Sequence, residues 1–290
     1  MVTKKFSIYS VFKYLFIILV AFTIIYPMLN IIAVSLSDNI YIMKNEVTFY
    51  PKGFNLNAYR IVLSDSSLLL SYWNTIKYVV LGTLISMVVT TCGAYALSKG
   101  KKLFGYRFFS VMIIITMFFS GGLIPEYLTM RALGLINTTW VIVLIGAVSA
   151  WNLMVMKTFF STIPQDLQDS GRIDGLNDFG ILFYIVLPLS SAILATISLF
   201  YAVGLWNSYF TPYIYLKDPN KYPIQIHLKQ LLIAGTNRSQ EAAMGMGDNL
   251  IMSESLVNAT IIVAIVPIII IYPFLQKYFV KGIMIGSLKE

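Results

Sequence analysis

Residues that could carry acid–base or metal chemistry are few in this sequence, and they are not grouped. The chain has one histidine, His227, and one cysteine, Cys92. Histidine, cysteine, aspartate and glutamate never recur at metal-ligand spacing, and the sequence has no Gly-x-x-x-x-Gly-Lys-Ser/Thr phosphate loop. A Ser/His hydrolase would need a serine poised near His227, which nothing in the sequence suggests. We therefore expect a non-catalytic chain without a metal or nucleotide site of its own.

The densest group of polar residues lies in segment 161–180, STIPQDLQDSGRIDGLNDFG. Ser161 or Thr162 can cap a helix entered at Pro164, and Asp166 falls in its first turn, where the helix dipole stabilises a negative charge. The pattern predicts a short surface helix over residues 165–174.

A turn is predicted where this helix ends. The Asp174-Gly175 pair favours it, because glycine tolerates the left-handed backbone that a sharp reversal needs. Asn177 or Asp178 can then cap the helix that follows. The segment would therefore project from the protein and return.

The side chains of this projection are suited to docking. Ser170 and Gly171 are small and permit close approach, while Asp169, Arg172 and Asp174 are available for polar pairing. We predict that the projection fits into the cleft of a partner protein.

Composition places the rest of the chain in a membrane. Of its residues 58% are hydrophobic and 12% charged, with a mean hydropathy of +0.76, whereas soluble domains are nearer a quarter charged. Cys92 lies inside one apolar run, and we expect it to be an ordinary small buried residue. A packed aqueous core does not need apolar runs this long, so membrane spans are predicted.

Six runs are long enough to cross a hydrocarbon core as helices. Helices are favoured over strands because the runs are continuous, not alternating. The first run is longer than a secretory signal core and is interpreted as an uncleaved helix. The runs are Tyr14–Leu36, Tyr72–Leu97, Phe108–Ile124, Trp140–Phe160, Phe179–Trp206 and Ala259–Val280.

Basic residues orient these spans. Lys and Arg concentrate in the termini and short loops of one side, so the positive-inside rule places both termini in the cytoplasm. The net charge of +8 therefore reflects topology and contact with membrane lipid, not nucleic-acid binding. The predicted organisation is a cytoplasmic N-terminus (1–13), one transmembrane domain (14–280) with cytoplasmic loop 161–180 and outer loop 207–258, and a cytoplasmic tail (281–290).

If the chain transports a solute, the energy for transport must come from outside this chain. Proton- and sodium-coupled carriers commonly place ionisable residues near the midplane, but no Asp or Glu lies in the core of any predicted span. A secondary carrier is therefore disfavoured.

Segment 161–180 resembles the cytoplasmic "EAA" loop of ATP-binding-cassette import permeases. That pattern is Glu-Ala-Ala, three residues, Gly, nine residues, then Ile-x-Leu-Pro. This chain has Asp169-Ser170-Gly171, Gly175, Ile185, Leu187 and Pro188 at those spacings. Asp-Ser-Gly replaces Glu-Ala-Ala, and Gly171 weakens a helix by roughly 1 kcal/mol relative to alanine.

Other segments resemble the carbohydrate-importer branch of these permeases, in its oligosaccharide and polysaccharide group. They are residues 94–98, 120–125, 199–207 and 272–282. The resemblance implies an all-α, six-helix permease with the MetI-like fold of type I importers. Its implied partners are a second homologous permease, an ATPase dimer that binds ATP and Mg, and an extracytoplasmic solute-binding protein.

The resemblance also implies roles for individual residues. Loop 161–180 would transmit ATPase closure to the spans, and Pro188 would kink the fifth span. The residues expected to couple the chain to the ATPase are Asp169, Ser170, Gly171, Arg172, Asp174, Gly175 and Pro188.

Four residues near the end of the fifth run are candidates to contact a sugar. Aromatic faces and amides commonly hold sugars, although an interfacial belt, packing or capping would explain the same residues. They are Tyr201, Trp206, Asn207 and Tyr209. Remaining alternatives are an ABC importer for another solute class, an energy-independent channel or secondary carrier, and a structural or sensory membrane protein.

Overall fold

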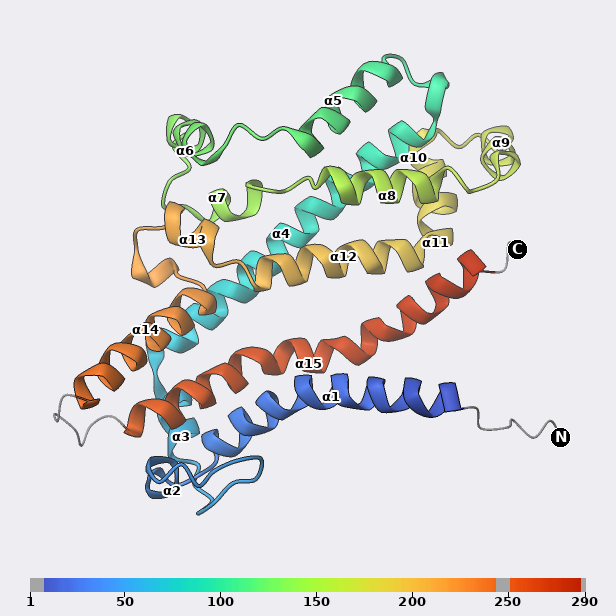
Figure 1. Cartoon of the computed structure of the whole chain (residues 1–290). Helices are drawn as coiled ribbons and strands as arrows, with labels where there is room; N and C mark the ends of the chain where they lie inside the picture. Colours follow the sequence, from blue (N-terminus) through green and yellow to red (C-terminus); the bar gives the residue numbers. More distant parts are fainter. Residues whose placement is uncertain (1–7, 244–250, 288–290) are drawn as a thin grey trace. The chain divides into compact units, whose positions relative to one another are not determined.

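A computed structural model describes residues 8–243 and 251–287, and these residues form helices and no strand (Figure 1). They divide into two compact units. The first unit contains residues up to 69 and 227–266, and the second contains residues 70–226 and the chain from 267. The all-α class predicted from the sequence is confirmed.

The first unit contains three whole helices and parts of three others. The three longest of these helices are mostly apolar. The elements are α1 (Ile8–Ser35), α2 (Asn39–Met43), α3 (Asn57–Ser64), α4 (Ser66–Ser98), α14 (Ile224–Ala243) and α15 (Ile251–Ser287). Within this unit Ser35 Oγ lies 2.8 Å from Tyr59 Oη, and Ser255 Oγ lies 3.2 Å from Asn39 Oδ1.

The second unit is built from shorter helices around the main part of α4. They are η1 (Gly100–Lys102), α5 (Tyr106–Phe118), α6 (Leu123–Ala132), α7 (Thr139–Leu144), α8 (Ala150–Phe160), α9 (Gln165–Ile173), α10 (Asp178–Ile181), the π-helical turn η2 (Leu182–Val186), α11 (Leu187–Leu189), α12 (Ser191–Trp206), α13 (Phe210–Tyr215) and η3 (Pro219–Lys221). Residues 207–258, expected to form an outer loop, include the helices α13 and α14.

Three of the six predicted runs contain an unbroken helix long enough to cross a membrane. These spans are Val11–Ser35, Ser66–Ser98 and Glu254–Pro273. Two further runs form bent pairs: α5 and α6 meet at 119°, and the helix ending at Leu189 meets α12 at 87°. Counting each bent pair as one span gives five within the described residues.

Unbroken helices over Phe108–Ile124, Trp140–Phe160 and Phe179–Trp206 were therefore the wrong expectation. The fourth run divides into α7 and α8 around residues 145–149, where Gly146 adopts φ +76°. In the fifth run Pro188 has no N–H to continue the helical ladder, and the chain turns at Ser190. The bend predicted at Pro188 is thus present, preceded by the π-helical turn.

The core of the second unit joins α4, α8, α10, η2 and α12. Apolar side chains from these helices are almost completely buried against one another, so the helices on either side of α9 share one core. The cluster consists of Ala94, Tyr95, Leu97, Leu153, Met156, Phe160, Ile181, Leu182, Val186, Ile197 and Tyr201. Burial of these side chains stabilises the frame from which α9 extends. In Figure 1, α9 follows the end of α8 and leads into α10.

Candidate functional site

The predicted surface helix is present as α9, but its N-terminus is not capped as expected. Pro164 occupies the N-cap position and no side chain caps the helix. The hydroxyls of Ser161 and Thr162 instead donate to the carbonyls of Lys157 (2.9 Å) and Phe159 (2.7 Å). They close the C-terminus of α8, where helical carbonyls lack partners. Asp166 does lie in the first turn of α9, as predicted.

The predicted turn at the other end of α9 is confirmed. Gly175 has φ +85°, its N–H donates to Arg172 O (3.0 Å), and Leu176 N–H donates to Gly171 O (2.9 Å). This pair of bonds is a Schellman motif, which satisfies two terminal carbonyls. Asn177 then caps α10, because its Oδ1 accepts from Gly180 N–H at 2.8 Å.

One face of α9 packs against its own chain. Gln168 and Gly171 are its buried residues. A Cβ on Gly171 would lie 2.6 Å from Ile185 Cδ1, so an alanine here would force Ile185 to shift. The close approach predicted at Gly171 is therefore to η2 of the same chain. Ser170 is exposed, and its hydroxyl donates to Asp166 O at 2.9 Å.

Lys99, directly after α4, connects that helix to α9. Its Nζ donates to Gln168 Oε1 at 2.6 Å, lies 3.9 Å from Asp178 Oδ1, and lies 4.2 Å from the centre of the Tyr95 ring. Burial lowers the pKa of Lys99, and the nearby Asp178 carboxylate opposes that shift. Sequence reasoning missed both Lys99 and Gln168, because their separation of 69 positions gives no local signal.

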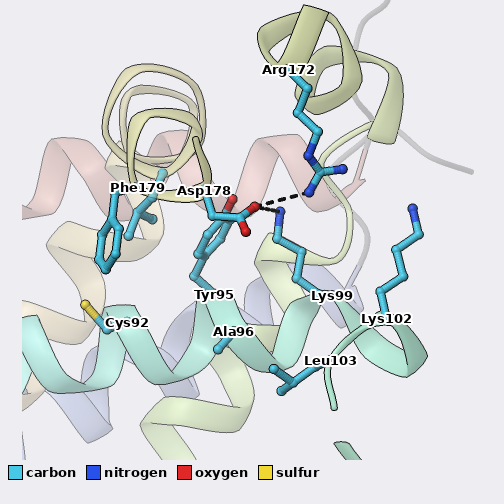
Figure 2. Close-up of a pocket in the computed structure, with 10 residues that line it drawn as sticks. Cys92, Tyr95, Ala96, Lys99, Lys102, Leu103, Arg172, Asp178 and Phe179 are labelled. Carbon is cyan, nitrogen blue, oxygen red and sulfur yellow. Dashed lines mark hydrogen bonds and ion pairs between the residues drawn. The ribbon is translucent and has the colours of Figure 1, made fainter. Parts of the chain in front are cut away.

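The charged residues of α9 pair within the chain. Arg172 donates to Asp169 Oδ1 at 3.2 Å. It also donates to Asp178 Oδ1 at 3.1 Å (Figure 2). The hydrogen bond to Asp178 raises the pKa of Arg172 above its usual value. Arg172 therefore fixes α9 to the start of α10, while Asp174 forms no ion pair among the residues that the structure describes.

Two apolar side chains of α9 are exposed. Ile173 is 87% exposed and Leu167 is 45% exposed, both on a helix that is otherwise polar. These two side chains are the large apolar groups that α9 leaves exposed. Sequence analysis assigned no role to Ile173.

A pocket of about 330 Å³ lies between the end of α4 and α10 (Figure 2). It is lined by Cys92, Tyr95, Ala96, Lys99, Lys102, Leu103, Arg172, Asp178, Phe179 and Leu182. Cys92 is exposed on this pocket, so the expectation of a buried residue was wrong. An apolar run does not reveal which face of its helix is left uncovered.

The four candidate sugar contacts do not form one cluster. Tyr201 is 7% exposed, and its Oη lies 2.7 Å from Thr90 Oγ1 and accepts from Ser149 N–H at 3.0 Å. Trp206 is buried with its ring edge-on to Tyr72. Asn207 donates to Val203 O, and Tyr209 stacks on Tyr213 with centroids 5.5 Å apart.

Tyr201 lines a second pocket, of about 290 Å³, at the break between α7 and α8. Irregular backbone at membrane depth is tolerated where it is buried in protein or lines a water-filled cavity. Trp206, Asn207 and Tyr209 do not line this pocket. Its lining is Ile142, Ile145, Gly146, Ser149, Asn152, Phe200, Tyr201, Gly204, Leu205, Ser208 and Thr211.

The long apolar helices are those of a membrane-embedded transport subunit. Helix α9, which lies between α8 and α10, gives this subunit an exposed segment to which a partner protein can bind. Residues 106–285 match the family model described as "Binding-protein-dependent transport system inner membrane component", and the chain belongs to this family. It is a non-catalytic, multi-pass membrane permease with the MetI-like fold. A solute-binding protein and an ATPase are therefore its partners.

Characterised relatives match almost the whole chain. The polygalacturonan/rhamnogalacturonan transport system permease protein YtcP of Bacillus subtilis is 38% identical over 286 residues, which cover 98% of this chain and 99% of YtcP. Protein LplC of the same organism is 37% identical, covering 99% of this chain and 97% of LplC.

A solved structure is similar over the same length. A chain of a bacterial ABC transporter involved in the import of the acidic polysaccharide alginate superposes with a TM-score of 0.86 at 33% identity. The match covers 96% of this chain and 100% of that one. The predicted family and fold are confirmed.

Proposed function

We propose that this chain is one of two homologous permease subunits of an ATP-binding-cassette importer that takes up oligosaccharides or polysaccharide fragments. The cargo class is supported by relatives whose names specify polygalacturonan, rhamnogalacturonan and alginate. A separate ATPase dimer binds ATP and Mg, and an extracytoplasmic binding protein delivers the sugar. Both termini and α9 face the cytoplasm. Six spans cross the membrane, and the third, fourth and fifth of them are interrupted.

The observation that carries the coupling role is the exposed Ile173 on a helix fixed at three places. Lys99 ties α9 to α4, Arg172 ties it to α10, and α8 leads directly into it. A partner that binds this apolar surface can displace α9 together with the helices attached to it. Packed helices move as rigid bodies because a packed core does not deform continuously. When the ATPase pair closes on ATP, it moves α9, and the movement reaches α4, α8 and α10 together.

We further propose that sugar passes along the pocket at the break of the fourth run. Its walls offer the hydroxyls of Ser149, Ser208 and Thr211, the amide of Asn152 and the ring of Phe200. These groups suit a hydroxyl-rich ligand, and broken helices commonly build transport sites. Tyr201 shapes this wall by holding Ser149, whereas Trp206, Asn207 and Tyr209 lie outside the pocket.

The test is uptake by the complete importer in proteoliposomes with the ATPase, the second permease and the binding protein. Labelled oligogalacturonides and neutral arabino-oligosaccharides serve as cargo. We expect uptake of at least one of them, dependent on ATP and on the binding protein, and reduced by Ile173→Asp but retained with Ile173→Leu. Uptake by the permease without the ATPase would favour a channel or secondary carrier instead. ATP-dependent uptake of amino acids but not sugars would assign another importer class.

A further inference from the structure

The pocket beside the end of α4 has an unequal distribution of charge. Lys99, Lys102 and Arg172 line it together with a single carboxylate, Asp178. Asp169 also pairs with Arg172 but does not line the pocket. Lys102 forms no hydrogen bond or ion pair through its side chain within the described part of the chain, so its charge is left for an external anion.

The remaining lining residues form an apolar wall beside these cations. They are Ala96, Leu103, Phe179 and Leu182, with Cys92 at the end of the pocket away from Lys102 (Figure 2). Cys92 lies on α4 seven residues before Lys99, a distance of about 10 Å along the helix axis. Phe179 is 69% exposed and the neighbouring Phe183 is 60% exposed, so the apolar surface continues beyond the pocket.

The position of the pocket matches this division. Cys92 belongs to the apolar α4, which is long enough to cross a membrane, whereas Lys99 and Lys102 follow its last residue, Ser98. The cations therefore lie at the level where a bilayer presents its phosphates, and the apolar wall lies at the level of the acyl chains.

From this arrangement we propose that the pocket binds one anionic phospholipid. Its phosphate pairs with Lys102 and approaches Lys99 and Arg172, while an acyl chain lies along Phe179 toward Cys92. A zwitterionic lipid brings its own cation to the same place and gains less from the surplus charge, so the site prefers an anionic headgroup. Because Lys99 and Arg172 also hold α9, bound lipid would occupy the joint between the coupling helix and α4.

The experiment uses the complete importer in nanodiscs with a trace of diazirine-bearing lipid. One sample contains a phosphatidylglycerol probe and the other a phosphatidylcholine probe, each with the diazirine on the acyl chain. Illumination is followed by peptide mass spectrometry. We expect about fivefold more cross-linking of the peptide around Cys92 and Leu103 with the phosphatidylglycerol probe, the preference that one lysine near the surface gives.

Two variants locate the effect. Lys102→Gln should remove most of the preference, whereas Lys101→Gln, in the same η1 turn but outside the pocket lining, should retain it. Unlabelled phosphatidylglycerol should compete with the probe, and inorganic phosphate should not.

Several results would overturn the proposal. Equal cross-linking by the two probes would remove the anionic preference, and an equal loss in both variants would show only general surface charge. Competition by inorganic phosphate would indicate an ion site. If neither probe labels this peptide while both label other parts of the chain normally, protein covers the pocket.

Discussion

Lys99 Nζ donates a hydrogen bond of 2.6 Å to Gln168 Oε1, and this bond joins the end of α4 to α9. Gln168 is one of two buried residues of α9, and Lys99 retains only 16% of its side-chain exposure. A short bond with one charged and one buried partner is worth more than an exposed ion pair. Helix α9 is thus attached to α4 as well as to the two helices that precede and follow it in sequence.

Lys99→Gln should loosen α9 without unfolding the protein. Loss of a hydrogen bond to a charged group costs about 1.5–3 kcal/mol, an effect confined here to the attachment of α9. Hydrogen exchange of the amides of α9 should rise by about tenfold or more, and the uptake of sugar per ATP hydrolysed should fall. Lys101→Gln is the matched control and should change neither quantity. Unchanged exchange in Lys99→Gln would show that the bond does not hold α9.

Gly175→Ala should destabilise the turn after α9. At φ +85° a side chain costs roughly 1–2 kcal/mol, although no atom lies within 4 Å of a Cβ there. Gly175→Asn should cost less, because asparagine tolerates this conformation better. Gly204→Ala, at a helical glycine with equally open surroundings, is the control and should not destabilise the protein. The melting temperatures of the purified complexes rank the variants. Equal melting temperatures for Gly175→Ala and Gly204→Ala would show that a side chain at position 175 causes no backbone strain.

Tyr201→Phe should weaken the packing of α12 against α8. The change removes the oxygen that accepts from Ser149 N–H, leaving that donor without its partner at a cost of about 1–3 kcal/mol. Ser208→Ala alters the same pocket without breaking a bond of Tyr201, so it should affect sugar uptake more than stability. Melting temperature and uptake are measured on both variants. Full stability in Tyr201→Phe would show that the bond contributes little.

Acidification should destabilise the protein partly through His227. Burial lowers the pKa of His227, while Asp65, whose Oδ2 lies 3.9 Å from Nε2, opposes the shift. The unfolded chain binds this proton more readily, so the free energy of unfolding falls as the pH drops below about 6.5, until the folded pKa is reached. His227→Gln should flatten part of this dependence, and Asp65→Asn should steepen it. A pH series of melting temperatures that is identical for wild type and His227→Gln would contradict this account.

Local signals predicted the coupling segment better than they predicted the spans. Asp166 lies in the first turn of α9, Gly175 forms the turn after it, and Asn177 caps α10, as predicted. These positions could be predicted because helix ends depend on residues that are neighbours in the sequence. The bend at Pro188 in the fifth run was predicted, because proline interrupts the helical ladder, but the breaks in the third and fourth runs were missed. An apolar run has the same composition whether it is one helix or two bent ones, since lipid and protein interior are both apolar.

Contacts between residues far apart in the sequence could also not be predicted from one sequence. Gly171 was expected to allow close approach by a partner protein, but the side chain against it is Ile185 of the same chain. The exposed face of Cys92 and the Lys99–Gln168 bond depend on how α4 packs with α9 and α10, which periodicity does not encode.

Cross-linking from Ile173 tests the central claim most directly. In a Cys92→Ser background, Ile173→Cys in the complete importer should cross-link to the ATPase through a short reagent that carries a maleimide for this cysteine at one end and a photoreactive diazirine at the other. Leu133→Cys, 63% exposed and predicted to lie on the opposite side of the membrane, should not. Cross-linking at position 173 and none at position 133 is the predicted result. Labelling of both cysteines without any cross-link to the ATPase from position 173 would contradict the coupling role of α9.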